Sequence, residues 1–250
     1  MADNKSLQKV YDAGELNWHS GYEESMGIAR MVKHWAGKTV LEIGCGPGHL
    51  ASILSYAGAN VTAIDYSAGQ IERAKNNYGT DRVNFKERDY RTIKKTRYQI
   101  IVLQGVLEHF DKPEVELKWI VDNLLKIEAG SQVILSVPHW WNPRGFILQA
   151  LRLILDAKIS LTDLHYFLPG DLKMMSQIVK MDLVDYAVVD ESWGAGREAI
   201  ADLVERIPKA LPDVDPEKVQ RLSDWLKRAL LDKTVAFEGL GATAIYKLVR

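Results

Sequence analysis

The sequence of 250 residues predicts an α/β protein with a doubly wound, mostly parallel sheet of seven strands, helices on both faces and a helical insertion before the last strand. Between Thr39 and Pro138, short apolar runs alternate with amphipathic helical segments, which is the pattern of a parallel sheet. Three glycines follow the first run within five residues, at 44–48. Polar residues recur where the runs end, and ligands of such sheets bind outside the carboxyl ends of the strands.

Composition narrows the class of protein. Apolar residues make up 47%, charged residues 26%, and the net charge is −1, so nothing favours a nucleic-acid partner. The single cysteine, Cys45, excludes an intramolecular disulfide and a zinc cluster built from thiolates. Met1–Lys9 has no apolar signal-peptide core, and there is no uncharged apolar run of about 18 residues. We therefore expect a cytoplasmic protein.

The first strand, Val40–Ile43, leads into the turn Gly44-Cys45-Gly46-Pro47-Gly48, and a helix is predicted over His49–Tyr56. Glycine is required where the backbone turns sharply or where a ligand must approach it closely. A turn that opens a helix also presents unpaired N–H groups and the positive end of the helix dipole. The turn therefore suits a ligand with hydrogen-bond acceptors or negative charge.

A second buried strand, Val61–Asp65, ends in an acid about twenty residues beyond the glycines, where a dinucleotide-type fold holds both ribose hydroxyls. A carboxylate suits a diol because it offers acceptor oxygens and no donor. The alternative is that Asp65 caps the next helix. Ser67 already provides that cap, in a capping box with Gln70, so we favour the ribose role.

Three further strands are predicted at Val83–Glu87, Tyr98–Leu103 and Gln132–Pro138. Asp89-Tyr90 follows the first of them, and Gln104-Gly105 follows the second. Asp89 either contacts a ligand or forms a local Asx-turn. The segment 11–35 is expected to be polar and aromatic at first and then helical, because Ile28, Met31, Val32 and Trp35 recur at helical spacing. Helices are also expected at 113–127, where proline stands in the first turn, and at 144–155.

The string Glu42-x-Gly44-x-Gly46-x-Gly48 resembles motif I of the class I S-adenosylmethionine-dependent methyltransferases, which have a Rossmann-like fold. The pattern A-x-x-L-x-x-x-G-A-x-V-T-x-I-D over 51–65 and the string Val-Leu-Glu-His at 106–109 are similar to the ubiquinone-biosynthesis O-methyltransferases and the methyltransferase type 11–12 group. The resemblance spans about residues 39–138. It departs from the family at Gln99, where an acid is usual.

This resemblance implies S-adenosyl-L-methionine as cofactor and S-adenosyl-L-homocysteine as product. It implies that Asp89 accepts from the adenine amine, that the next backbone N–H meets a ring nitrogen, and that Gln104 and Gly105 lie near the methionine moiety. The implied cofactor-binding residues are Glu42, Gly44, Cys45, Gly46, Gly48, Asp65, Tyr66, Asp89, Tyr90, Gln104 and Gly105.

The segments after Pro138 should hold the methyl acceptor. His139 and His165 are the candidate general bases, because imidazole titrates near neutrality. Trp140, Trp141 and Tyr166 are the candidate substrate residues, which favours a small hydrophobic or aromatic acceptor. The alternative for each histidine, and the commoner role of a lone histidine, is a packed or capping residue. No metal is predicted, because the pair Glu108-His109 offers too few ligands; those two residues either contact substrate or cap a helix.

One methyltransferase domain, 1–250, is expected. Within it we distinguish an N-terminal helical lid at 1–37 and a cofactor-binding core at 38–138. In the lid, Tyr11, Trp18 and His19 would lie over the ligand; the alternative is a helix that only packs on the sheet. An acceptor-side insertion occupies 139–168, and a helical cap insertion occupies 190–238, covering the acceptor or forming a homodimer surface. Within the cap insertion, 196–233 is predicted to form two helices separated by Pro208, Pro212 and Pro216. The apolar helix 144–155 covers the core, lines the acceptor site or makes a peripheral membrane contact.

The predicted function is methyl transfer from S-adenosylmethionine to an oxygen, or nitrogen, of a small acceptor. One rival is an NAD(P)-dependent oxidoreductase, which Asp65 and the pair Tyr90-x-x-x-Lys94 would suit. The glycine spacing and the position of that pair after the third strand disagree with it. The other rival is a non-catalytic relative that binds the cofactor or a partner enzyme.

Overall fold

The fold is built on one seven-stranded sheet with the strand order β3-β2-β1-β4-β5-β7-β6. The computed structural model describes residues 21–79, 83–94, 96–160, 162–231 and 239–250. The strands are β1 (Thr39–Ile43), β2 (Asn60–Asp65), β3 (Val83–Glu87), β4 (Ile100–Gln104), β5 (Gln132–Pro138), β6 (Asp182–Val189) and β7 (Thr243–Val249). The predicted fold class is confirmed, and the first, second, third and fifth predicted strands match the observed ones to within a residue.

The first five strands pair in parallel, and their register places every carboxyl end at the same edge. Ile43 of β1 lies between Ile64 of β2 and Leu103 of β4. The chain runs outward from β1 to β2 and β3, and then crosses back to β4 and β5 on the other side of β1. The strand order therefore reverses between β1 and β4, where doubly wound sheets bind their ligands.

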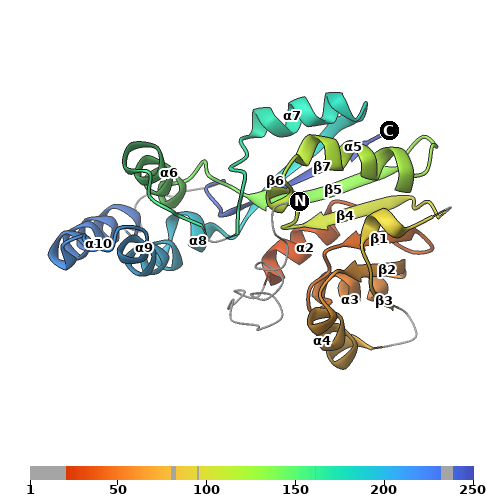
Figure 1. Cartoon of the computed structure of the whole chain (residues 1–250), viewed down its shortest axis with the longest axis horizontal. Coiled ribbons are helices and arrows are strands. Elements are labelled where there is room, and N and C mark those ends of the chain that lie inside the picture. The colour runs from red at the N-terminus through yellow and green to blue at the C-terminus, as the bar shows by residue number, and fades with distance from the viewer. Residues whose placement is uncertain (1–20, 80–82, 95, 161, 232–238) are drawn as a thin grey trace. The chain divides into compact units, whose positions relative to one another are not determined.

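Helices cover both faces of this sheet (Figure 1). α2 (Tyr22–Arg30), α3 (His49–Tyr56) and α4 (Ala68–Tyr78) lie on one side, and α5 (Pro113–Leu124) and α7 (Pro169–Ile178) lie on the other. Ser67 caps α4 as predicted, because its side chain accepts a hydrogen bond from the backbone N–H of Gln70 at 3.2 Å. None of the helices among the described residues has the length and hydropathy of a membrane span.

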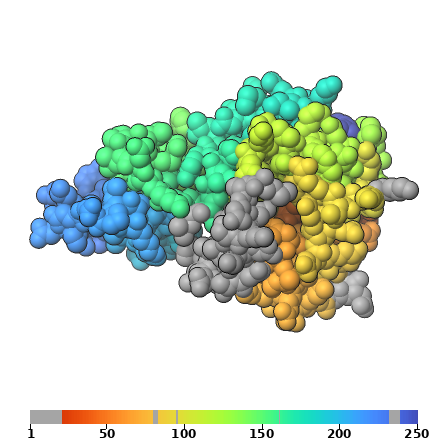
Figure 2. Space-filling view, in the orientation of Figure 1, coloured from red at the N-terminus to blue at the C-terminus, as the bar shows by residue number. Residues whose placement is uncertain are grey.

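The chain divides into two compact units. Unit 1 comprises 1–137, 169–186 and 245–250, and unit 2 comprises 138–168 and 187–244. Unit 2 contains α6 (Pro143–Leu155), α8 (Glu191–Ala195), α9 (Arg197–Ala210) and α10 (Pro216–Leu230). α9 and α10 form a continuous surface, blue in Figure 2. Two 3-10 turns, η1 (Tyr90–Thr92) and η2 (Leu107–His109), belong to unit 1.

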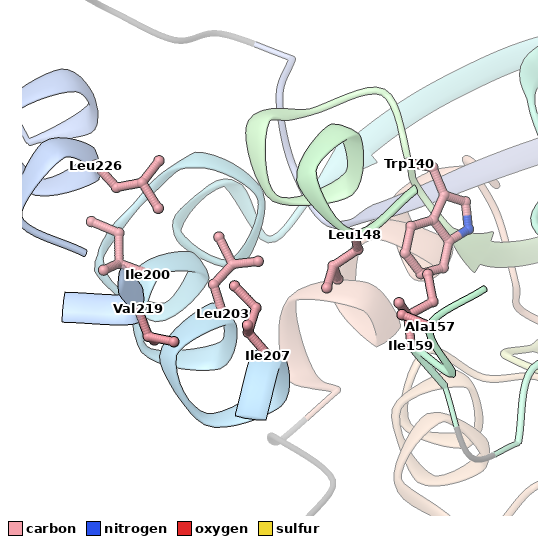
Figure 3. Packing of buried hydrophobic residues seen from close by; sticks show 9 residues of the cluster. All are labelled: Trp140, Leu148, Ala157, Ile159, Ile200, Leu203, Ile207, Val219 and Leu226. Atoms are coloured by element: carbon pink, nitrogen blue, oxygen red, sulfur yellow. The ribbon is translucent and has the colours of Figure 1, made fainter. Parts of the chain in front are cut away.

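Unit 2 has an apolar core of its own, drawn in Figure 3. Leu226 and Val219 of α10 face apolar side chains of α9, and Leu148 of α6 approaches Leu203 and Ile207 of α9. The core comprises Trp140, Leu148, Ala157, Ile159, Ile200, Leu203, Ile207, Val219 and Leu226. The two predicted insertions thus build one core from segments that lie far apart in the chain.

Three predicted helix boundaries were wrong. α2 ends at Arg30 and not at Trp35, although Met31, Val32 and Trp35 are buried as the helical spacing suggested. The indole N–H of Trp35 donates to the carbonyl of Ala29 at 2.8 Å, which holds the ring against the helix end without a further helical turn. α5 ends at 124 and not at 127. α9 continues through Pro208, which was expected to separate two helices.

Candidate functional site

The turn after β1 holds three glycines with positive φ, at +73° for Gly44, +49° for Gly46 and +85° for Gly48. A Cβ on Gly44 would lie 2.6 Å from Val106, and one on Gly48 would lie 2.8 Å from the ring of Phe85. A Cβ on Gly46 would meet no atom of the described residues within 4 Å. Two glycines are therefore required by packing, whereas Gly46 presents bare backbone to open space.

The carboxylate of Asp65 joins this turn to the end of β2. Its Oδ2 accepts from the N–H of Gly46 and its Oδ1 accepts from the N–H of Ser67, both at 2.9 Å. The N–H groups of Gly44 and Cys45 also bond to the carbonyl of Ile64, at 2.8 and 3.0 Å. The side chain is buried and oriented from both sides, so the acid is fixed beside the open face of Gly46.

Glu42, the acid before the turn, is fully buried, and its Oε2 has no hydrogen-bond partner among the described residues. Burial, and then the neighbouring Asp65, raise the pKa of the Glu42 carboxyl to about 8, while a backbone hydrogen bond from Ala51 at the start of α3 works against this. Burial, together with Glu42 and Asp65, also raises the pKa of the Cys45 thiol. Cys45 is therefore a packed thiol, and Glu42 is a buried carboxyl that keeps its proton at neutral pH.

Asp89 lies at the end of β3, and the N–H of Arg88 before it bonds to the carbonyl of Asp65. Oδ1 of Asp89 accepts from the N–H of Arg91, so the acid caps η1, as its local alternative expected. The phenol of Tyr90 is buried and donates to Glu116. Burial and this contact raise the pKa of Tyr90, which opposes the proton-transfer role that an oxidoreductase would require of it. Tyr66, after β2, is 37% exposed.

Sequence reasoning missed Glu24, which α2 places over the carboxyl ends of β4 and β5. Its carboxylate accepts from the amide of Gln104 at 3.0 Å and from the hydroxyl of Ser136. The hydroxyl of Ser25 donates to Oε1 of Gln104 at 3.1 Å. Glu24 resembles an ordinary first-turn acid in sequence, and no local signal points to partners 80 and 112 residues away.

His139, in unit 2, is buried with 4% exposure. Its Nδ1 lies 2.9 Å from the carbonyl of Gly241, so Nδ1 carries the proton in that contact and Nε2 keeps the lone pair. Burial lowers the pKa of His139, against the smaller effect of that hydrogen bond. Asn142 donates to the same carbonyl, which ties the start of α6 to the segment before β7.

The other acceptor-side candidates also belong to unit 2. Trp140 is buried, its Nε1 finds no acceptor in the described part of the chain, and its ring meets Tyr166 edge-on at 5.1 Å. The guanidinium of Arg152 lies 4.5 Å from the centre of the Tyr166 ring. Trp141 is 59% exposed. His165 is partly exposed and stacks on Phe167.

The residues of unit 1 fit a nucleoside ligand. A bare glycine turn opens a helix next to an oriented carboxylate, which is the chemistry that a diol and an adjacent polar chain require. Asp65 ends β2 and Asp89 follows β3, while Gln104 ends β4 on the other side of β1. Glu42, in β1 directly before the turn, has one buried carboxyl oxygen without a partner among the described residues.

Comparisons with known proteins agree with this geometry. The family model described as "Methyltransferase domain" matches residues 24–176, which is more than half of the chain. The mitochondrial ubiquinone biosynthesis O-methyltransferase of Schizosaccharomyces pombe is 31% identical over 108 residues, covering 41% of this chain and 38% of that protein. The malonyl-[acyl-carrier protein] O-methyltransferase of Anoxybacillus flavithermus is 48% identical over 85 residues, covering 32% of each.

These matches span only about a third of the length of the curated relatives. Among solved structures, magnesium protoporphyrin IX methyltransferase from Synechocystis with bound S-adenosylhomocysteine aligns with a TM-score of 0.57 and 14% identity, over 99% of this chain and 94% of that one. At that identity the likeness concerns the fold. Taken with the family match and the motifs after β1, β2 and β4, it leads to one assignment: the chain belongs to the class I S-adenosylmethionine-dependent methyltransferases.

Proposed function

We propose that the protein transfers the methyl group of S-adenosylmethionine to an oxygen of a small hydrophobic or aromatic acceptor. The observation that carries the proposal is the Asp65 carboxylate, which accepts hydrogen bonds from the N–H of Gly46 after β1 and from the N–H of Ser67 after β2. The names of the relatives support oxygen as the acceptor atom, since both curated proteins are O-methyltransferases. Nitrogen remains the second candidate atom.

The cofactor roles follow the strand order. Asp65 and Tyr66 would hold the ribose, Asp89 and the backbone of Tyr90 the adenine, and Gln104-Gly105 the methionine end. The glycine turn, with Gly44, Cys45, Gly46 and Gly48, would let the cofactor approach the backbone. Glu42 would supply a buried carboxyl directly before the turn, protonated at neutral pH in the cofactor-free protein. Oriented carboxylates and bare backbone are the groups that a nucleoside with a polar tail binds best.

When bound, the cofactor supplies a sulfonium-activated methyl group that needs no further activation. The chain must then hold the acceptor lone pair in line with the departing bond and exclude water. If the acceptor is a hydroxyl, its proton must leave, and His139 or His165 would take it. The neutral His139 imidazole, with its proton on Nδ1, keeps a basic Nε2. Trp140, Trp141 and Tyr166 would provide aromatic surface for the acceptor.

A titration distinguishes this proposal from its rival. We expect S-adenosylhomocysteine to bind and NADH not to bind, because the glycine turn is one residue shorter than the dinucleotide spacing. Tight NADH binding would assign the site to an oxidoreductase. Incubation of a metabolite extract with methyl-labelled cofactor then identifies the acceptor by its labelled product, and absence of any labelled product with intact cofactor binding would favour the non-catalytic relative.

Once the acceptor has been identified, the general-base role can be tested. His139→Ala and His165→Ala should lower turnover more than cofactor affinity if either imidazole accepts the proton. Unchanged turnover in both variants would remove the base from the mechanism. The methyl transfer would then rely on orientation alone, as an acceptor that is already ionised allows.

The remaining sequence predictions on organisation are part of this proposal. Residues 1–37 would act as a lid, with Tyr11, Trp18 and His19 outside the described residues; 139–168 would serve the acceptor, and 190–238 would form a cap or a homodimer surface. On α6, Leu153 and Ile154 are 69% and 75% exposed, which suits a peripheral membrane contact through 144–155. Flotation with vesicles tests the membrane contact, and light scattering tests the homodimer. A cytoplasmic location stays a prediction.

A further inference from the structure

A polar network joins α2 to the carboxyl ends of β4 and β5. Ser25 donates to Oε1 of Gln104, and Nε2 of Gln104 donates to Oε2 of Glu24. The hydroxyl of Ser136 donates to Oε1 of Glu24 and accepts from the N–H of Gly105 at 3.2 Å. One carboxylate therefore connects two strands and the loop between β4 and η2.

Both the oxygen and the nitrogen of the Gln104 amide are hydrogen-bonded in this network, so the amide is fixed in one orientation. Gly21, which precedes α2, approaches so closely that a Cβ there would lie 3.1 Å from Nε2 of Gln104. Ser25 and Ser136 are buried, with 1% and 0% exposure. In such surroundings a charge-assisted hydrogen bond is stronger than a neutral one, and loss of one partner is costly.

The network lies at one end of the proposed cofactor site. The nucleoside would lie toward β2 and β3, where Asp65 ends β2 and Asp89 follows β3, with the glycine turn after β1. The amino-acid end of the cofactor must then face the next strand across the switch point, which is β4. Gly105 has φ +60°, and its N–H is bound by Ser136, so the shape of this loop depends on the network.

We propose that Glu24 is a positioning residue that shapes the part of the site for the amino-acid end of the cofactor, by holding Gln104 and Ser136 and through them the loop at Gly105. This inference rests on the proposed function. It assigns the N-terminal helix a specific role in cofactor binding that differs from covering the ligand. Glu24 acts through Gln104 and Gly105 and is not itself a catalytic residue.

Four variants test the network. In Glu24→Gln, the amide of Gln104 can rotate by half a turn. The amide introduced at position 24 then donates to the oxygen of Gln104, and the nitrogen of Gln104 donates to the hydroxyl of Ser25. The hydrogen bonds are kept and only the charge is lost. Glu24→Ala removes two acceptors. Gln104→Glu places two carboxylates against each other. The double variant Glu24→Gln/Gln104→Glu exchanges the roles and restores every donor–acceptor pair.

The readout is the Kd of two probes, S-adenosylhomocysteine and 5′-methylthioadenosine, which keeps the nucleoside and lacks the amino-acid end. We expect Glu24→Ala and Gln104→Glu to raise the Kd of S-adenosylhomocysteine by about tenfold or more and that of methylthioadenosine by less than about threefold. Glu24→Gln should lie within about threefold of the wild type, and the double variant should bind S-adenosylhomocysteine at least about threefold more tightly than Gln104→Glu does. Glu23→Gln, on an exposed neighbouring acid, is the matched control.

If the network had only a structural role, the variants would lower the melting temperature and either leave the affinity for both probes unchanged or reduce both affinities equally. Either result would overturn the inference. If Glu24→Ala does not fold, the double variant still tests the inference. A folded double variant that does not regain S-adenosylhomocysteine binding would contradict the inference. Asp65→Ala separates the two proposals. If Asp65→Ala reduces the affinity for both probes and the Glu24 variants reduce neither, this inference fails and the proposed function stands.

Discussion

Oδ2 of Asp65 accepts a hydrogen bond from the backbone N–H of Gly46 at 2.9 Å, so the last residue of β2 fixes the turn that follows β1. The bond joins residues 19 positions apart and crosses the place where two parallel strands end. Because Oδ1 is held by Ser67, the carboxylate keeps a single orientation. These two hydrogen bonds therefore fix the carboxylate and the turn relative to each other at the carboxyl edge of the sheet.

Asp65→Ala should raise the Kd of S-adenosylhomocysteine by at least about tenfold, because the diol loses a charged acceptor and Gly46 loses its partner. Isothermal titration measures the effect, with Asp213→Ala as the control, since Asp213 is an exposed acid of unit 2. Equal affinity of the Asp65 variant and the wild type would refute the cofactor assignment.

The glycines of the turn should respond differently to alanine. Gly48→Ala should destabilise the fold by about 2 kcal/mol, because its Cβ would meet Phe85 and Ala74 at 2.8 and 2.9 Å. Gly46→Ala should cost only the left-handed strain of about 1 kcal/mol but should abolish tight cofactor binding, since its Cβ would enter the open face. Thermal melting and titration separate the two effects.

Gly37→Ala is the matched control, because Gly37 has φ +74° and open space around its Cβ but precedes β1, away from the ligand edge. It should lose as much stability as Gly46→Ala and keep full affinity. An equal loss of affinity in both variants would mean that backbone strain, and not close approach of a ligand, explains Gly46.

Glu42 should make the cofactor-free protein less stable as the pH rises. The folded protein keeps the carboxyl protonated up to a pKa of about 8, whereas the unfolded chain releases the proton near 4.5. This contribution is complete below pH 4.5 and is lost as the pH approaches 8. Glu42→Gln should flatten the melting temperature between about pH 5 and about pH 8.5, and Glu72→Gln, on an exposed acid, should not.

A Glu42→Gln profile that remains parallel to the wild type would show that the carboxyl is already ionised at neutral pH. The orphaned Oε2 would then have to be satisfied by a donor outside the described residues. The comparison therefore tests the burial of Glu42 independently of any cofactor.

The two candidate bases should differ in their structural cost. His139→Ala should destabilise the protein by about 1–3 kcal/mol, because it removes a buried ring and leaves the carbonyl of Gly241 with one donor fewer. His165→Ala should cost less than about 1 kcal/mol, since the ring is partly exposed on Phe167. Chemical denaturation measures both, and a larger loss for His165 would contradict this ranking.

The sequence predicted the elements whose causes are local. The turn at 44–48 and the Ser67 cap follow from glycine conformation and from a side chain bonding three residues ahead. The strands β1 to β5 follow from apolar runs bounded by turns. The role of Glu24 could not be predicted, because a helix acid gives no sign of which distant strand it will meet. The end of α2 depends on how Trp35 folds back onto Ala29.

Pro208 illustrates the same limit. A proline inside a helix removes one hydrogen bond, which argues for a helix end, yet α9 runs two residues further. Ile207, Leu203 and Ile200 of this helix are buried in the core of unit 2, and that burial outweighs the local penalty. The prediction failed because the packing partners lie in α6 and α10, which the local pattern does not reveal.

The core of unit 2 has a consequence for synthesis on the ribosome. Leu148 leaves the exit tunnel more than fifty residues before Leu203 and Ile207, the side chains against which it finally packs. Throughout that interval an apolar helix lacks its partners and is open to wrong associations. A nascent chain that stops before α9 should thus aggregate or recruit chaperones, whereas one that extends past Leu226 can bury Leu148.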